Sequence, residues 1–221
     1  NIHDLKELTD LLSSFYAIDV DADLTEILDS LTSKASVAIK KKLIVSCHRP
    51  ALTENIKTLE GLVKTKSKAI VKCSPVIQSF VELKQLYDWF GKNPSGRLIF
   101  PRSDENNKNS DWQWFRQFML SKQVLNFVND GFSPVPDQPT LLDTFLFSDP
   151  VNHFAAVIGN PIYHSFSPVL HYEFMKKRNM PYYGIKIEEK EFDEAMDFLE
   201  EIGRRAASVT SPFKEAAYRL Y

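Results

Sequence analysis

Short apolar or β-branched runs alternate along this chain with stretches of helical periodicity, and no other feature constrains the fold as strongly. Five such runs stand in the first two thirds of the 221 residues, over 15–21, 43–48, 69–74, 97–101 and 124–128. Patterns typical of helices flank them, over 2–14, 23–41, 53–65, 76–90, 112–120 and 139–147. Strict alternation of strands and helices favours a parallel sheet, either open or closed into a barrel.

The polar stretch "SDPVNH", residues 148–153, interrupts this series. Behind it, strands are predicted over 154–160, 182–188 and 206–212, with helices over 167–179 and 190–203 between them. We therefore expect two α/β domains, residues 1–148 and 154–221, joined by a linker over 149–153. A barrel of eight βα units needs about 250 residues, so the first domain would be a partial (β/α)8 barrel that lacks its N-terminal units.

Composition excludes several classes of function. A formal charge of −2, with no block of Lys and Arg, provides no electrostatic footprint for nucleic acid. No run approaches the roughly 18 apolar residues that predict a membrane span. Two cysteines, Cys47 and Cys73, are too few for a disulfide framework and predict a reduced, cytoplasmic protein. The chain begins at Asn1 and ends in a helical pattern without a stop signal, so we expect both ends to be cut from a longer protein.

The strands over 43–48 and 69–74 flank one helix and form a βαβ unit, whose crossover is expected to be right-handed. Because side chains alternate along a strand, His48 and Lys72 are expected on one face, at the carboxyl end of the sheet, where ligands of such folds bind. Burial disfavours the charged form of a lysine and makes its amine nucleophilic, and a histidine beside it can move protons. The alternative is structural, with Lys72 extending into water and His48 a satisfied strand-end residue. The two cysteines would face the helices.

The motifs "LIVSCH", "AIVKCS", "FRQF" and "PVPDQP" follow one another between residues 43 and 139. Together they resemble the type I 3-dehydroquinate dehydratases over residues 15–145. That family is a (β/α)8 barrel that converts 3-dehydroquinate to 3-dehydroshikimate through a lysine Schiff base and needs no cofactor. The resemblance implies that Lys72 forms the imine and that His48 is the general acid and base. It also implies that Arg116 holds the substrate carboxylate and that Gln138 hydrogen-bonds the substrate.

The stretch "GNPIYHSFSPVLH", residues 159–171, joins an apolar run to an amphipathic one. Ser167 followed by Pro168 predicts a helix start, with the serine at the N-cap and the proline at the first helical position. Capping does not account for Ser165 or His164. Spare hydroxyls beside a helix N-terminus suit an anionic carboxylate, but from this stretch alone a purely structural interpretation is equally favoured.

A second strand end, "ASVTSPFK", residues 207 to 214, places the Thr210 hydroxyl and the Lys214 ammonium at the same sheet edge. By itself it is also explained as a first helical turn with a solvated lysine. The two stretches together resemble the substrate-binding N-terminal domain of shikimate dehydrogenases over residues 153–221. The resemblance implies that Ser165 and Ser167 bind the carboxylate of shikimate and that Thr210 and Ser208 bind ring hydroxyls. It implies that Lys214 is catalytic and handles the proton at the reacting oxygen.

None of the seven glycines forms the dinucleotide-binding pattern G-x-G-x-x-G. NADP, which the second resemblance implies, is therefore expected to bind a domain beyond Tyr221, and no residue of this chain is assigned to it or to a metal. The two resemblances in this order are typical of the bifunctional enzymes of the shikimate pathway of aromatic amino acid biosynthesis. Their substrates would be 3-dehydroquinate, 3-dehydroshikimate and shikimate, and a plant-like source would place the protein in a plastid.

Two alternatives to a bifunctional enzyme stay open. The first is a non-catalytic binder or sensor of shikimate-like acids, which Pro134 and the residues after His48 favour because they depart from the dehydratase pattern. The second is an enzyme in which only the dehydrogenase half is active.

Overall fold

The computed structural model describes residues 17–24, 43–65, 69–104, 106, 110–131, 135–146 and 150–220. The chain divides into two compact units, and each is described by itself. The first comprises Asn1–Val76 and Leu86–Pro101, and the second comprises Ile77–Gln85 and Arg102–Tyr221. The helix predicted over 2–14 lies outside the described residues, as does nearly all of the helix predicted over 23–41.

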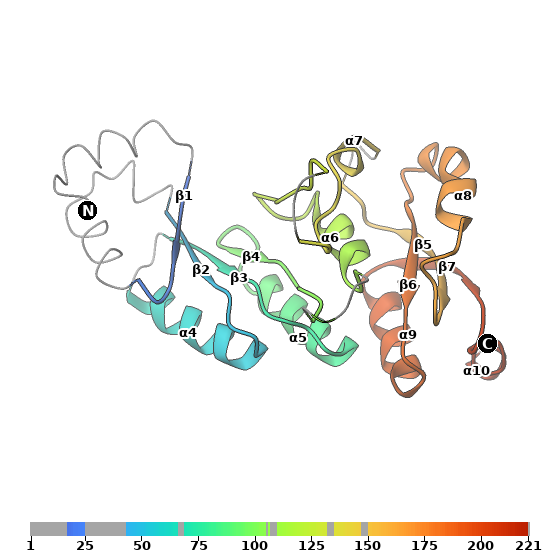
Figure 1. Cartoon of the computed structure of the whole chain (residues 1–221), viewed down its shortest axis with the longest axis horizontal. Helices are drawn as coiled ribbons and strands as arrows, with labels where there is room; N and C mark the ends of the chain where they lie inside the picture. The colour runs from blue at the N-terminus through green and yellow to red at the C-terminus, as the bar shows by residue number, and fades with distance from the viewer. Residues whose placement is uncertain are drawn as a thin grey trace. The chain divides into compact units, whose positions relative to one another are not determined.

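Four parallel strands form the sheet of the first unit, in the order β1-β2-β3-β4 (Figure 1). They are β1 (Ile18–Asp21), β2 (Leu43–Cys47), β3 (Ile70–Cys73) and β4 (Arg97–Ile99). Each strand pairs with the next in sequence, which confirms the parallel α/β arrangement predicted for this region. Every residue of β2 is buried, as expected for an apolar strand covered on both faces.

Helix α4 (Leu52–Thr65) connects β2 to β3 and packs on both strands. Its buried face includes Leu52, Asn55 and Leu59. Helix α5 (Phe80–Gly91) begins later than its periodicity predicts, because the backbone is capped just before Phe80. The Oγ atom of Ser79 accepts the Glu82 N–H at 3.2 Å, and the Glu82 carboxylate accepts the Gln78 N–H at 2.8 Å. This exchange satisfies two backbone donors and starts the helix at Phe80.

The second unit is built on a three-stranded parallel sheet in the order β6-β5-β7. The strands are β5 (Phe154–Gly159), β6 (Tyr182–Lys186) and β7 (Arg204–Val209). The helices are α6 (Gln113–Met119), α7 (Asp143–Leu146), α8 (Ser167–Lys176), η1 (Glu189–Glu191), α9 (Phe192–Glu201) and α10 (Lys214–Leu220). Helix α8 packs on β5 and β6, α9 packs on β7, and α6 contacts β6. The strands and helices predicted between residues 154 and 221 are therefore confirmed, with small shifts of their ends.

An aromatic cluster fills the space between α6 and the sheet of the second unit. The ring of Phe118 lies 5.6 Å from that of Phe154, and the Phe154 ring lies 5.5 Å from Tyr183. Trp114 lies 6.2 Å from Tyr183 and 6.3 Å from Phe154, measured between ring centroids. Rings at these separations add attraction to the burial of their apolar surface. The cluster therefore joins α6, which precedes the predicted linker, to the strands that follow it.

The strand predicted over 124–128 is wrong. These residues form an irregular loop, next to an isolated bridge between Asn129 and Thr140. The Asn126 side chain donates to the Leu120 carbonyl at 2.8 Å and accepts from Gln123 Nε2 at 2.9 Å. An amide that bonds to nearby backbone competes with sheet pairing, and this favours the loop after α6. The second unit continues across residues 149–153, so the domain boundary placed there stays a prediction.

Two properties of the described residues bear on function. Within the part of the chain that the structure describes, no helix is long and apolar enough to cross a membrane. Among the same residues, no group of three or more His, Cys, Asp or Glu side chains is arranged to hold a metal ion.

Replacing Phe118 tests the contribution of the aromatic cluster. Phe118 is fully buried, so Phe118→Ala is expected to lower the free energy of unfolding of the second unit by about 3–5 kcal/mol through lost burial and the cavity left behind. Amide hydrogen exchange along β5 measures this free energy. The matched control is Phe145→Ala, because that ring is 73% exposed and should cost little. Equal losses from the two variants would contradict the assignment of Phe118 to the core.

Candidate functional site

The carboxyl ends of β5, β6 and β7 lie at one edge of the second sheet. Gly159 at the end of β5 pairs with Lys186 of β6, and the Thr210 N–H beyond β7 donates to the Ile158 carbonyl at 2.9 Å. A Cβ atom on Gly159 would overlap the methyl group of Thr210, so only glycine allows the Thr210 side chain to lie against β5. The absence of a side chain at Gly159 therefore permits the position of a predicted substrate-binding residue.

The loop that leaves β5 carries two of the predicted ligand hydroxyls. Both Ser165 and Ser167 are partly buried. The Ser165 N–H donates to the Ile162 carbonyl at 2.9 Å, and the Ser165 Oγ accepts the Ser167 N–H at 3.3 Å. The predicted N-cap role of Ser167 is wrong: Ser167 is the first residue of α8, and Phe166 occupies the N-cap without a side-chain bond. Because Ser165 already accepts the first free N–H, the Ser167 hydroxyl is not needed to cap the helix.

The end of β7 carries the other predicted ligand groups. Ser208 is exposed, and its Oγ accepts a hydrogen bond from the Tyr182 hydroxyl at 2.8 Å. The His171 ring of α8 lies 5.0 Å from the ring of Tyr182. Lys214 is the exposed first residue of α10. The structure therefore brings all five residues predicted for the dehydrogenase-like site to the segments at the carboxyl ends of β5 and β7.

A group of charged residues beside this loop was not predicted from the sequence. The Tyr163 hydroxyl donates to Asp111 Oδ1, and Lys186 Nζ lies 3.5 Å from Asp111 Oδ2. Lys186 Nζ also lies 2.9 Å from Glu188, whose other oxygen accepts from Asn160 Nδ2 at 3.0 Å. Burial lowers the pKa of Lys186, but Glu188 and Asp111 outweigh burial and raise that pKa above its ordinary value. Lys186, the lysine in the predicted strand "YYGIKIE", is the feature of the sequence that could have indicated this group.

The Asp137 carboxylate organises the segment around α6. It is 1% exposed and accepts four hydrogen bonds from three residues: both the N–H and the hydroxyl of Ser103, the Ser110 hydroxyl and the Trp112 N–H. Burial lowers the pKa of Arg116 in α6 to about 10, against the opposing influence of Asp137. Arg116 is therefore still protonated at neutral pH. Gln138 is half-buried, and its carbonyl accepts from Gln113 Nε2 at 3.1 Å.

Two contacts between basic and acidic side chains lie toward the carboxyl end of the first sheet. Lys72, in β3, is 8% exposed, and its Nζ lies 2.6 Å from Asp19 Oδ2 of β1. His48, just beyond β2, is exposed and has its Nδ1 3.5 Å from Asp21 Oδ2. Ser46 lies opposite Lys72 in the pairing of β2 with β3. A buried ammonium is costly without an opposite charge, so Asp19 makes the position of Lys72 tenable.

The sequence interpretation did not assign a role to the aspartates of β1. Asp19 and Asp21 alternate along the strand, and this spacing is the signal that places them on one face. Asn55 of α4 holds the loop after His48, because its Nδ2 donates to the carbonyls of Arg49 and Ala51 at 2.6 and 2.8 Å. Lys72 and His48 belong to the first unit, whereas Arg116 and Gln138 belong to the second, so each pair is described separately.

Cys47 and Cys73 are free and buried, as predicted. They lie opposite each other in β2 and β3. Burial raises the pKa of both thiols, so neither is a reactive thiolate at neutral pH.

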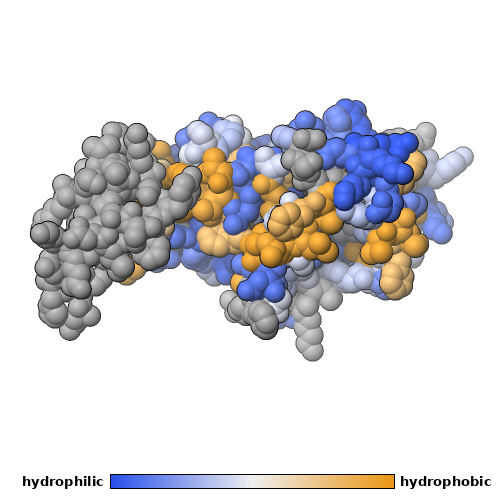
Figure 2. Space-filling model, turned by 90° about the horizontal axis from the view of Figure 1, so that it is seen from above, coloured by the Kyte–Doolittle hydropathy of each residue, from blue (hydrophilic) through white to orange (hydrophobic). Residues whose placement is uncertain are grey.

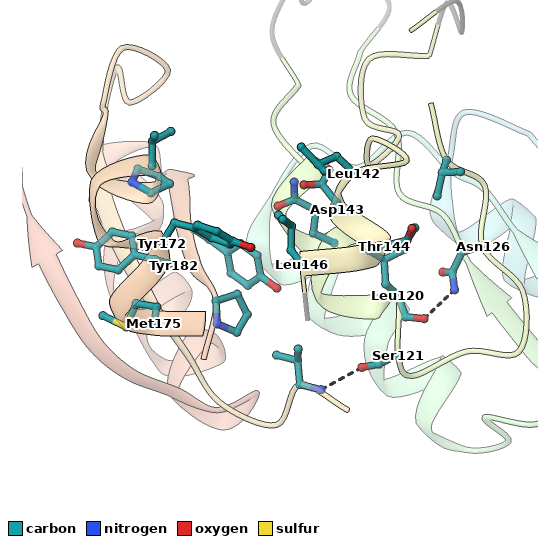
Figure 3. Close-up of a pocket in the computed structure, with 17 residues that line it drawn as sticks. Leu120, Ser121, Asn126, Leu142, Asp143, Thr144, Leu146, Tyr172, Met175 and Tyr182 are labelled. Carbon is teal, nitrogen blue, oxygen red and sulfur yellow. Dashed lines mark hydrogen bonds between the residues drawn. The ribbon is translucent and has the colours of Figure 1, made fainter. Parts of the chain in front are cut away.

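A cavity of about 770 Å³ lies between α8, β6 and the segment from α6 to α7 (Figure 3). Tyr172 and Met175 face it from α8, Tyr182 faces it from β6, and Leu142 and Leu146 face it from the other side. The described residues that line it include none of the nine predicted site residues. Tyr182 connects the two regions, because it lines the cavity and donates its hydroxyl to Ser208.

Residues 157–221 match the family model described as the shikimate dehydrogenase substrate binding domain. A shikimate dehydrogenase (NADP(+)) of Syntrophobacter fumaroxidans is 43% identical over 65 residues, which are 29% of this chain and 23% of that protein. The corresponding enzyme of Coxiella burnetii is 43% identical over 67 residues, 29% of this chain and 25% of that protein. That of Xanthomonas euvesicatoria is 40% identical over 73 residues, 32% of this chain and 25% of that protein. The similarity therefore spans about a quarter of the length of these relatives.

Replacing Gly159 tests the close approach of Thr210 to β5. Gly159→Ala is expected to displace the Thr210 side chain and to destabilise the second unit by about 1–3 kcal/mol, as overpacking does. Amide exchange along β5 and the amide resonance of Thr210 measure the two effects. The matched control is Gly184→Ala in β6, where a Cβ atom would meet only Ile162 at 3.9 Å and Pro168 at 4.0 Å. If both variants behave alike, the contact with Thr210 has no special effect.

Proposed function

We propose that residues 154–220 are the substrate-binding part of an NADP-dependent shikimate dehydrogenase, which reduces 3-dehydroshikimate to shikimate. One observation carries the proposal. The polar residues at the carboxyl ends of β5 and β7 all fall within the residues that match the substrate-binding domain: Ser165, Ser167, Ser208, Thr210 and Lys214. Four hydroxyls and one ammonium suit a small carboxylate that carries several ring hydroxyls.

The carboxylate of the substrate is assigned to the N-terminal end of α8. Ser165 and Ser167 present hydroxyls there, and the N-terminus of a ten-residue helix attracts an anion. The ring hydroxyls are assigned to Ser208 and Thr210. Because the Tyr182 hydroxyl donates to Ser208, the Ser208 proton is left for the ligand.

Reduction of the ring ketone needs a hydride at carbon and a proton at oxygen. NADPH supplies the hydride when it is bound. Lys214, at the start of α10, would donate the proton to the carbonyl oxygen, so that the ketone becomes a secondary alcohol. The chain contains no G-x-G-x-x-G pattern, and none of its residues is assigned to the cofactor.

We further propose that the first unit and the residues up to about 145 belong to a type I 3-dehydroquinate dehydratase with a (β/α)8 barrel. The product of that reaction is the substrate of the dehydrogenase. Sequential parallel pairing from β1 to β4 is the neighbour relation of such a barrel and supports the proposal. The buried Lys72 would form the imine with release of water, and Asp19 is placed to accept the proton that its ammonium must lose. His48, beside Asp21, would move the protons of the elimination.

Titration of the 221-residue chain with shikimate, followed by NMR of the backbone amides, tests the first proposal. We expect shifts at Ser165 and Thr210. Ser165→Ala should weaken binding about tenfold or more, because hydrogen bonds to charged groups contribute about 1.5–3 kcal/mol. The matched control is Ser211→Ala, whose residue is exposed in the loop before α10. An absence of binding, or equal effects of the two variants, would contradict the assignment.

Borohydride trapping tests the second proposal. The protein produced from its native gene is incubated with 3-dehydroquinate and borohydride, and we expect a covalent adduct on Lys72 by peptide mass spectrometry. Lys72→Arg keeps the positive charge opposite Asp19 but cannot form an imine, so the adduct should be lost while the fold is retained. An adduct that persists in this variant would refute the role of Lys72.

A further inference from the structure

The loop that carries Ser165 is attached at two points to charged side chains outside it. Tyr163, two residues before Ser165, donates its hydroxyl to Asp111. Asn160, at the beginning of the loop, donates to Glu188 at 3.0 Å. Lys186 joins the two attachments, since its ammonium lies 2.9 Å from Glu188 and 3.5 Å from Asp111. The loop conformation therefore depends on a connected set of four side-chain contacts.

The position of Asp111 is itself fixed by the buried Asp137. Asp111 lies between Ser110 and Trp112, and both of these donate to the Asp137 carboxylate, at 2.8 and 3.1 Å. The Asp111 N–H donates to the Ser103 hydroxyl at 2.9 Å, and that hydroxyl donates to Asp137 at 2.7 Å. One buried carboxylate holds the backbone on both sides of Asp111. The Asp111 side chain therefore has a defined direction, toward the loop.

The charges of this set also suit an anionic ligand nearby. Asp111 and Glu188 would together repel a carboxylate bound at the start of α8. Lys186, only 22% exposed in its side chain, lies against both acids and offsets part of their charge. Charge-assisted hydrogen bonds of this kind are shorter and stronger than neutral ones, so they can hold a loop in one conformation.

We propose that Asp111 is a positioning residue for the substrate site: through Tyr163 and Lys186 it holds the loop that presents Ser165 and Ser167 to the substrate carboxylate. This inference rests on the proposed shikimate binding by the second unit. Asp111 lies outside residues 157–221, which match the substrate-binding domain, so the match does not account for this contact. The segment before the dehydrogenase-like region would thus act on the affinity of its site.

The first measurement needs no ligand. Asp111→Ala and Tyr163→Phe are each expected to speed amide exchange of Ser165 about tenfold in the 221-residue chain, because each removes a bond to a charged group that holds the loop. The double variant should add little to Asp111→Ala, since that substitution already removes the bond from Tyr163. Asp111→Asn keeps an acceptor for Tyr163 and should fall in between. The matched control, Asp197→Asn on the exposed face of α9, should change nothing.

The second measurement is the shikimate dissociation constant of the same variants. We expect Asp111→Ala and Tyr163→Phe to weaken binding about fivefold to tenfold, with unchanged amide exchange of Ile158 as evidence that the sheet is intact. Faster Ser165 exchange with unchanged affinity would overturn the positioning role. Unchanged Ser165 exchange would overturn the network itself. If the parent chain does not bind shikimate, the proposed function fails, and the exchange measurement still decides whether Asp111 holds the loop. If Asp111→Ala does not fold, Tyr163→Phe, which removes one hydroxyl, decides the same question.

Discussion

The contact of Trp114 and Phe118 with Phe154 and Tyr183 is the interaction on which the second unit depends. A sheet of three strands cannot bury both faces without covering elements, and β5 is buried along its whole length. Helix α6 provides part of this cover with its buried aromatic side chains. By holding α6 on the sheet, the cluster also brings the residues before α6 to the end of β6. The polar contacts of Asp111 with Tyr163 and Lys186 are possible only because this apolar packing places the segment there.

Both units place a lysine near the carboxyl end of a parallel strand and set an acidic residue against it. Lys72 of β3 contacts Asp19, and Lys186 of β6 contacts Glu188 and Asp111. The functional hydroxyls and amines proposed here are therefore surrounded by groups that control charge as well as shape. Motif resemblance identified the lysine in the first unit but none of these acidic neighbours. At both sheet edges, the acidic residues that offset the lysine charge lie outside the motifs that carry the two resemblances.

The sequence predicted those features that depend on local patterns. Alternating apolar runs predicted the parallel strands of both sheets, and the alternation of side chains along a strand gave the expectation that His48 and Lys72 share one face. The strand predicted over 124–128 does not form because the Asn126 side chain bonds to the Leu120 carbonyl. This local bond competes with sheet pairing, and the hydrophobic pattern does not reveal it. The prediction of Ser167 as the N-cap was wrong because the Ser165 hydroxyl, two residues earlier, accepts the N–H of Ser167. Asp111 and Asp19 were missed because their partners lie 52 and 53 residues away in the chain.

The aromatic cluster determines where this polypeptide can be divided. The family match begins at residue 157, inside β5, whereas Phe154, Tyr183 and Phe198 are covered by rings of α6, which lies well before that point. A shortened chain that starts at the linker would leave exposed to water those apolar surfaces of the three rings that α6 covers. Such surfaces drive self-association of soluble domains. A boundary drawn from family similarity alone would therefore separate the sheet from the aromatic side chains of α6 that cover it.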